Sequence, residues 1–181
     1  MAFPTPQILT ERLTPLLTAR GLDLEHVKAT PAGKKSQVVI RVDGDERPSS
    51  DLLGEVSDEI STFFDDLEAR GELNFGAGYT LEVSTPGVDL PLTAPRHFRR
   101  NRGRVISLEG KTVGRLGALS PDESSVILVA RAKKELRVSV AQLENLAGAV
   151  VEIEFARAPE DELRVTEQSF EQAAEQADRE D

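Results

Sequence analysis

Large apolar residues recur every three or four positions near the start of the chain, which is the spacing of one face of a helix. The residues on this face are Ile8, Leu9, Leu13, Leu16 and Leu17. Thr5 can cap the helix with Pro6 in its first turn, where a missing N–H costs nothing, and Gly21 suits its end. Pro15 lies inside the pattern, so we expect it to kink the helix or split it.

The apolar pattern then takes the spacing of strands. Residues 22–29 alternate and residues 37–42 are rich in β-branched side chains, so each segment predicts a strand. A second helix is predicted from Ser49 or its neighbour, because four apolar residues share one face: Leu52, Val56, Ile60 and Phe63. Residues 79–84 predict a third strand. This order predicts an α/β sandwich over residues 1–92, with two helices on one side of a three-stranded sheet.

After residue 92 the pattern changes to short strands separated by tight turns. Pro91 to Pro95 predicts a stiff linker. Five short apolar runs follow, at residues 105–108, 112–119, 126–130, 136–139 and 150–155. So many short strands in about 60 residues are typical of a small barrel. We therefore expect an α+β protein whose second domain, residues 93–157, is a small SH3-like or Sm-like β-barrel.

The last segment, residues 158–181, differs in composition from both domains. From residue 160 onward it carries 9 Asp/Glu against 2 Arg, with few large apolar residues. A segment that can bury so little apolar surface is expected to be an acidic tail that is disordered or weakly helical.

Composition narrows the chemistry that the protein can perform. The chain has no cysteine, which excludes disulfides, thiolate metal ligands and cysteine nucleophiles. His26 and His97 are its only histidines, and neither has the partners of a catalytic or metal site, so we expect no enzymatic activity, no metal and no cofactor. The chain also lacks a signal-peptide pattern and a run of about 18 apolar residues, so we expect a cytoplasmic protein.

The net charge of −10 is unevenly divided. Residues 1–95 carry 8 Lys/Arg against 16 Asp/Glu, residues 96–116 carry 7 against 1, and residues 117–181 carry 7 against 15. A basic stripe therefore lies between two acidic regions. Acidic surface repels phosphate and attracts basic proteins, so much of this chain suits a basic protein partner better than bare RNA.

The most specific pattern in the chain lies within residues 79–103. It reads Tyr-Thr-Leu-Glu-Val-Ser-Thr-Pro-Gly-Val-Asp from residue 79, followed by Pro91-Leu92, His97-Phe98-Arg99-Arg100 and Gly103. This pattern resembles the signature of the RimP family, with Thr85 and Leu90 standing where the family has Ser and Arg. The residues of this motif and of the expected turn between the domains are Ser84, Pro86, Gly87, Asp89, Pro91, His97 and Phe98.

The Pro86-Gly87 pair suits the middle of a type II turn, because Pro fixes φ and Gly permits a positive φ. Such a turn either positions one domain against the next or contacts a partner directly.

The resemblance implies a ribosome maturation factor that binds the immature small ribosomal subunit and promotes its late assembly, including rRNA processing, without catalysis. The implied partners are the small-subunit rRNA and the twelfth ribosomal protein of the small subunit, which is strongly basic, and we expect a monomer. One alternative is a general RNA-binding or regulatory module with an Sm-like barrel. The other is an enzyme of unknown type, for which the sequence shows no convergent catalytic residues.

Candidate contacts with rRNA or ribosomal protein lie in two basic clusters. Arginine binds phosphate and carboxylate in a bidentate manner and stacks on bases. The first cluster follows the linker and consists of Arg96, Arg99, Arg100, Arg102 and Arg104. The second lies on a predicted hairpin and includes Lys133 and Lys134. The alternative for both clusters is that they are solvated or paired with acidic residues of the same chain.

Overall fold

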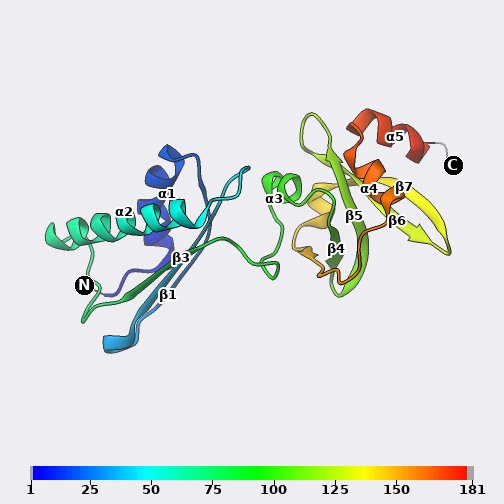
Figure 1. Cartoon of the computed structure of the whole chain (residues 1–181). Helices are drawn as coiled ribbons and strands as arrows, with labels where there is room; N and C mark the ends of the chain where they lie inside the picture. The colour runs from blue at the N-terminus through cyan, green and yellow to red at the C-terminus, as the bar shows by residue number, and fades with distance from the viewer. Residues whose placement is uncertain (1, 179–181) are drawn as a thin grey trace. The chain divides into compact units, whose positions relative to one another are not determined.

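The computed structural model describes residues 2–178 and contains two compact units (Figure 1). The first unit ends at Pro86 and the second begins at Gly87, upstream of the boundary predicted after residue 92. The first contains a three-stranded sheet with two helices and the second a five-stranded antiparallel sheet, so the predicted α+β class is confirmed. None of the helices within residues 2–178 is long and apolar enough to cross a membrane.

The first unit has the predicted order of elements. They are α1 (Pro6–Ala19), β1 (Asp23–Thr30), the short 3-10 helix η1 (Gly33–Lys35), β2 (Gln37–Asp43), α2 (Ser50–Ala69) and β3 (Thr80–Ser84). Strand β2 is central, antiparallel to β1 and parallel to β3. Parallel strands need a crossover connection, and α2 supplies it on the face of the sheet that α1 also covers.

Both long helices begin at the side-chain caps that the sequence predicts. The Thr5 hydroxyl accepts a hydrogen bond from the Ile8 N–H at 3.2 Å, and the Ser49 hydroxyl accepts one from the Leu52 N–H at 3.1 Å. Helix α1 is not split at Pro15. This proline has no N–H to donate to the carbonyl four residues before it. Because it lies on the exposed side of the helix, water can donate a hydrogen bond to that carbonyl instead.

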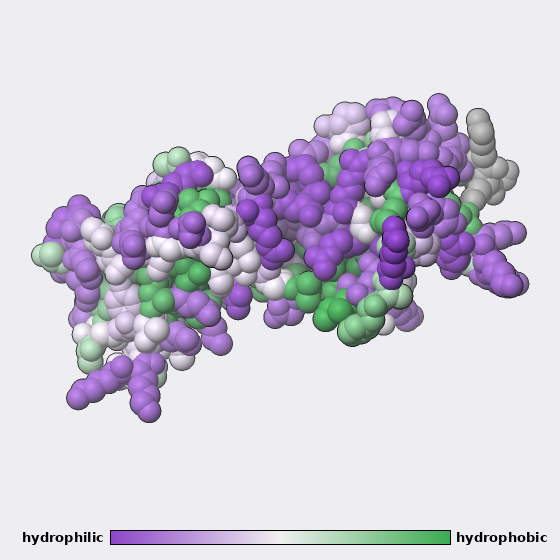
Figure 2. All heavy atoms as spheres, viewed as in Figure 1, coloured by the Kyte–Doolittle hydropathy of each residue, from purple (hydrophilic) through white to green (hydrophobic). Residues whose placement is uncertain are grey.

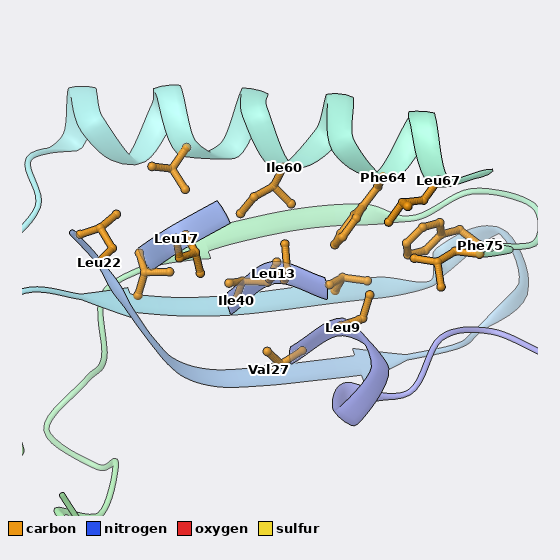
Figure 3. Packing of buried hydrophobic residues seen from close by; sticks show 14 residues of the cluster. Leu9, Leu13, Leu17, Leu22, Val27, Ile40, Ile60, Phe64, Leu67 and Phe75 are labelled. Atoms are coloured by element: carbon orange, nitrogen blue, oxygen red, sulfur yellow. The ribbon is translucent and has the colours of Figure 1, made fainter. Parts of the chain in front are cut away.

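One apolar core holds the first unit together (Figure 3). Three residues of α1 and three of α2 meet over the sheet, all fully buried: Leu9, Leu13, Leu17, Ile60, Phe64 and Leu67. At one end of this core, the ring of Phe75 lies 5.0 Å from that of Phe64 and 4.4 Å from that of Tyr79, measured between centroids. The only tyrosine of the chain is therefore packed into an aromatic cluster.

The second unit consists of a short helix and five strands. Its elements are α3 (Pro95–Arg100), β4 (Val105–Leu108), β5 (Lys111–Leu119), β6 (Ser125–Ala132), β7 (Glu135–Gln142), the 3-10 helix η2 (Leu143–Leu146) and β8 (Val150–Val151). The sheet order is β7-β6-β5-β4-β8. All five predicted strands are present, but β7 and β8 are not paired within the part of the chain described, so the sheet is not closed into the expected barrel.

Strand β8 is shorter than the predicted strand over residues 150–155. The Glu152 N–H still donates to the Val105 carbonyl at 2.8 Å, and the chain then leaves the ladder. A strand of two residues offers too few backbone donors and acceptors to pair with a second neighbour along its length.

Strand β6 is buried on both faces. Val126 and Leu128 belong to one apolar cluster, whereas Ile127 and Val129 belong to another on the opposite face. The first cluster is the main core of the unit and includes Phe98, which is fully buried. The second cluster needs its own covering layer.

That layer is the segment expected to be an acidic tail, disordered or weakly helical, and the structure differs from the expectation of disorder. The segment forms α4 (Glu160–Glu167) and α5 (Phe170–Asp178), which pack on the sheet. Val165 is 5% exposed and Ala173 is fully buried. Large apolar residues are few because alanines form much of the packed side of α5. Residues 179–181 of the predicted tail lie outside the described residues.

Removal of α4 and α5 is expected to destabilise the second unit. A chain ending at residue 158 leaves Ile127, Val129 and Val138 in water, and burial of such a side chain contributes about 1.5–3 kcal/mol. We expect the free energy of unfolding to fall by about 3 kcal/mol or more, measured by urea denaturation. A chain ending at residue 178 is the control. Equal denaturation midpoints for the two chains would contradict the packing.

Tyr79 is expected to keep its phenolic proton to unusually high pH. Burial, followed by the negative charges of Asp65 and Glu68, raises the pKa of Tyr79 to about 12. The folded state favours the protonated ring, so this contribution to stability is complete below the unfolded pKa of about 10 and is lost as the pH rises towards 12. The chain has one Tyr and no Trp, so an ultraviolet titration reports this group alone. A native midpoint near that of the urea-unfolded chain would show that the ring is not packed in the cluster.

Candidate functional site

Helix α3 carries the first basic cluster at the start of the second unit. Phe98 is fully buried and fixes this helix to the core. The Nδ1 atom of His97 accepts hydrogen bonds from the N–H groups of Thr93 at 3.0 Å and Ala94 at 2.9 Å. The imidazole therefore satisfies backbone donors at the start of the helix, which is a structural role.

The exposed members of the cluster are Arg99, Arg102 and Arg104, and we take Arg99 and Arg104 as the two accessible to a partner. The Nη1 atom of Arg99 donates to Oε2 of Glu123 at 2.8 Å. Both side chains of that pair are 42% exposed, so the pair stabilises the fold by less than about 1 kcal/mol and can exchange partners readily. Arg104 lies in the turn before β4, whereas Arg96 and Arg100 are partly buried.

Arg102 has partners within the protein that the sequence did not indicate. Its guanidinium donates to the backbone carbonyls of Thr166 and Gln168, the second at 2.7 Å. These carbonyls lie at the end of α4, where no backbone N–H remains to serve them. Arg102 therefore caps α4 and attaches it to the turn after α3, so its role in this structure lies within the fold.

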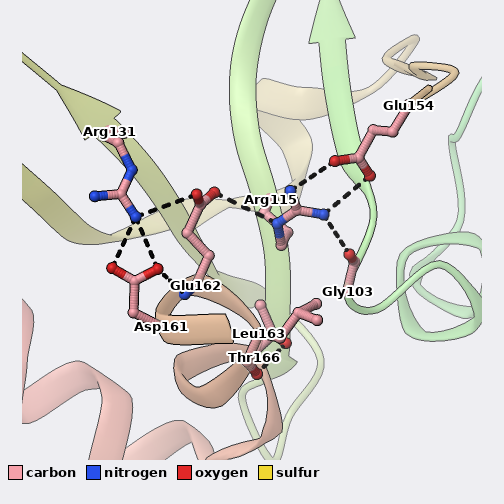
Figure 4. Close-up of polar contacts among 8 residues, drawn as sticks. All are labelled: Gly103, Arg115, Arg131, Glu154, Asp161, Glu162, Leu163 and Thr166. Carbon is pink, nitrogen blue, oxygen red and sulfur yellow. Dashed lines mark hydrogen bonds and ion pairs between the residues drawn. The ribbon is translucent and has the colours of Figure 1, made fainter. Parts of the chain in front are cut away.

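A buried arginine with carboxylate partners, which sequence reasoning missed, lies in the same unit (Figure 4). Arg115 of β5 is 3% exposed, and its Nη1 and Nη2 donate to the two carboxylate oxygens of Glu154 at 2.9 and 2.6 Å. Nη1 also donates to the Gly103 carbonyl at 2.9 Å, and Nε donates to Glu162 at 3.5 Å. The hydrogen bond with Arg115 lowers the pKa of Glu154, so this carboxylate stays charged in the folded protein.

Arg131 of β6 holds the start of the same helix. Its Nη2 donates to both carboxylate oxygens of Asp161 at 2.8 Å and to Glu162 at 3.4 Å, and this hydrogen bonding lowers the pKa of Asp161. Together with Arg102 and Arg115, it binds α4 at both ends. The signal that could have revealed this network is a single arginine within an apolar strand, paired with acids near the end of the chain.

The second basic cluster, Lys133 and Lys134, lies at the tip of the β6–β7 hairpin. Both side chains are exposed, and both residues have positive φ, at 61° and 143°. Figure 1 shows this hairpin tip and α3 on opposite sides of the second unit. The two predicted clusters therefore do not form one continuous surface.

The motif after β3 forms a different turn from the one predicted. A type II turn centred on Pro86-Gly87 requires a positive φ at Gly87, which this glycine does not have. Instead the Leu90 N–H donates to the Gly87 carbonyl at 3.3 Å, so the turn begins at Gly87. A Cβ at this position would lie 2.6 Å from Oδ1 of Asp89, and the carboxylate would have to move.

The remaining motif residues make backbone contacts on either side of this turn. The Pro86 carbonyl accepts a hydrogen bond from Arg47 at 3.4 Å. Pro91 is exposed, and directly after it the Leu92 N–H donates to the Ala149 carbonyl at 2.7 Å. The motif thus contributes local contacts within each unit.

The two histidines lie on different elements and do not form a common site. His97 caps α3, and His26 is exposed on β1 opposite Arg41 of β2. Within residues 2–178, no group of three or more His, Asp or Glu side chains is placed to hold a metal ion.

Comparison with known proteins identifies relatives over the whole chain. Residues 12–89 match the family described as the RimP N-terminal domain. The chain is 60% identical to the ribosome maturation factor RimP of Corynebacterium aurimucosum, with 100% of both chains covered. It is 53% identical to the protein of that name from Corynebacterium diphtheriae, over 96% of each chain. For Corynebacterium kroppenstedtii the identity is 45%, over 95% of this chain and 99% of the relative.

Replacement of Arg115 by Met is expected to destabilise the second unit strongly. The change removes the charged hydrogen bonds of a buried guanidinium to Glu154 and Glu162, and hydrogen bonds to charged groups contribute about 1.5–3 kcal/mol each. Arg99→Met is the matched control, because it removes an exposed ion pair that contributes less than about 1 kcal/mol. Urea denaturation of both variants measures the difference. Similar decreases in the two variants would show that burial does not decide the strength of these pairs.

Proposed function

The chain belongs to the RimP family of ribosome maturation factors, and we propose that it binds the immature small ribosomal subunit in the cytoplasm and promotes late assembly without catalysis. Its likeness to named maturation factors over the whole chain supports a role in ribosome maturation. The observation that supports binding to the small subunit in particular is the separation of charge between the two units. Accessible guanidiniums gather at the start of the second unit, and carboxylates dominate the first.

The first unit suits a basic protein. Residues 1–86 carry 8 Lys/Arg against 15 Asp/Glu. Helix α2 contains no Lys or Arg, and its exposed side presents Asp51, Glu55, Asp58, Asp65 and Asp66. Such a surface attracts cationic chains over a Debye length of about 8 Å at physiological salt. The partner that we propose for it is the twelfth ribosomal protein of the small subunit, which the family resemblance implies.

The second unit suits rRNA at two separate places. Arg99 and Arg104 can bind phosphates near α3, and Lys133 and Lys134 can do so at the hairpin tip. Because these places lie on opposite sides of the unit, they would meet different segments of folded rRNA. Contacts of this kind fix a register between protein and RNA but read no base sequence.

Binding alone can promote assembly. A protein that binds one assembly intermediate more tightly than the others raises the population of that intermediate, by no more than its differential affinity. No bond is made or broken in such a mechanism, so it needs no nucleophile, general base or cofactor.

The proposal predicts where the protein is found in a cell lysate. We expect it to sediment with small subunits and their precursors rather than with translating ribosomes. A strain without it should accumulate unprocessed small-subunit rRNA, measured by primer extension at the precursor ends. Normal processing in that strain, together with binding to many unrelated RNAs, would favour a general RNA-binding module instead.

Removal of the accessible arginines should weaken attachment to precursor particles. We expect the double change Arg99→Gln and Arg104→Gln to lower the slope of log K against log salt by roughly 0.7–0.9 for each phosphate that the variant no longer binds. Binding measured over a salt series tests this slope. The control is Arg12→Gln with Arg70→Gln, which removes two arginines from exposed pairs in the first unit. An unchanged slope in the first variant would show that its arginines are merely solvated.

A further inference from the structure

The segment after β8 exposes an aromatic ring almost completely. Phe155 is 97% exposed, whereas Phe75 and Phe98 in the two cores are 1% and 0% exposed. Figure 2 shows hydrophilic residues over much of the visible face of the second unit and apolar residues at its lower edge. Ile153, two residues earlier, is also exposed, and apolar side chains that are exposed together can mark an interaction site.

The ring is held outward by its neighbours. Glu154 is drawn towards the sheet by Arg115, and Glu152 accepts a hydrogen bond from the Thr112 hydroxyl at 2.6 Å. In extended chain, successive side chains point to opposite sides, so the side chains that flank Glu154 face away from the sheet. Ile153 is accordingly 63% exposed and Phe155 more so, while Glu154 is 32% exposed. The ion pair with Arg115 therefore attaches to the sheet the segment that carries the exposed ring.

Two exposed guanidiniums belong to the chain segments around this ring: Arg157 follows it in the chain, and Arg104 directly precedes β4, the strand that pairs with β8. Arg157, two residues further on, is 87% exposed and forms an ion pair with Glu160 at 3.8 Å. The charge of Arg104 is close enough to Glu154 to contribute to the lowering of its pKa, after the larger effect of Arg115. The carboxylates nearest to Phe155 are engaged by internal donors, whereas these two guanidiniums are exposed.

We propose that Phe155 is a stacking platform for an unpaired base of single-stranded RNA, with Arg104 and Arg157 on the adjoining phosphates. Proteins bind unpaired bases with an exposed aromatic ring beside cations. Such stacking accepts any base, because every base has a flat aromatic face. This inference rests on the proposed function only in taking rRNA as the source of the strand.

The size of the apolar surface favours RNA over a docked protein. Among the described residues of the second unit, the exposed large apolar side chains are Val88, Val140, Ile153 and Phe155. A stable protein interface buries about 800 Å² on each partner, with several well-packed anchors. A base needs only one face of one ring, which is what this segment offers.

The absence of Trp from the chain makes the platform directly measurable. A Phe155→Trp variant has one tryptophan, at the proposed site, and its fluorescence should be quenched when a single-stranded RNA oligonucleotide without self-pairing is added. Val140→Trp, on β7 at a position 42% exposed, is the control and should not respond. Fluorescence anisotropy of labelled RNA then gives the affinity of each variant.

Affinity should follow the aromatic character of the side chain. We expect Phe155→Tyr and Phe155→Trp to bind the oligonucleotide as the parent does, and Phe155→Leu to bind about tenfold more weakly, because leucine keeps apolar area but cannot stack. Thermal unfolding should be equal in all variants, since the side chain makes no core contact.

Three results would overturn the proposal. They are unchanged affinity in Phe155→Leu, no RNA binding by the parent, and quenching of the Phe155→Trp variant by a lysine-rich peptide but not by RNA, which would identify a protein-docking site. The measurement uses purified protein and an oligonucleotide. It can therefore fail while sedimentation with small-subunit precursors, the test of the proposed function, succeeds.

Discussion

The ion pairs of the buried Arg115 guanidinium are the interaction on which the second unit depends. A guanidinium in the middle of a sheet cannot reach water, so its partners must come to it from other parts of the chain. Glu154 arrives from the segment after β8 and Glu162 from α4, and each guanidinium nitrogen has an acceptor. Burial of charge is tolerable only with such complete hydrogen bonding.

This one constraint shapes three parts of the unit (Figures 1 and 4). Beyond the end of β8, Glu154 bonds Arg115 of β5 rather than continuing the ladder. The same guanidinium fixes α4 on the outer face of the sheet, where Arg102 and Arg131 complete the attachment. It also sets the direction in which the side chains next to Glu154 leave the surface. The end of β8 and the attachment of α4 thus meet at one guanidinium.

The first unit could be predicted almost completely from the sequence, whereas the second could not. Its helices and strands follow local periodicity, and caps such as Thr5 mark their ends. In the second unit the structure depends on contacts between residues far apart in the sequence, which local patterns do not reveal. The run Val126–Val129 is apolar at every position, as in a strand buried on both faces. Such a strand needs a covering layer on each face, and the segment that forms one of these layers, α4 and α5, has a composition that predicted disorder. The partners of Arg102 and the carboxylate partners of Arg115 lie 39 to 66 residues away, beyond any spacing rule. The accessible candidates, Arg99 and Arg104, were found by charge alone.

The position of α4 and α5 at the end of the chain has a consequence for the order of folding during synthesis. A ribosome releases the chain from its N-terminus, so every residue of the first core is available once Pro86 has emerged. The sheet of the second unit, by contrast, is synthesised well before its cover. Until Val165 and Ala173 emerge, Ile127 and Val129 face water and Arg115 lacks one of its carboxylates. The nascent protein therefore passes through a stage in which one unit is complete and the other is open on one face.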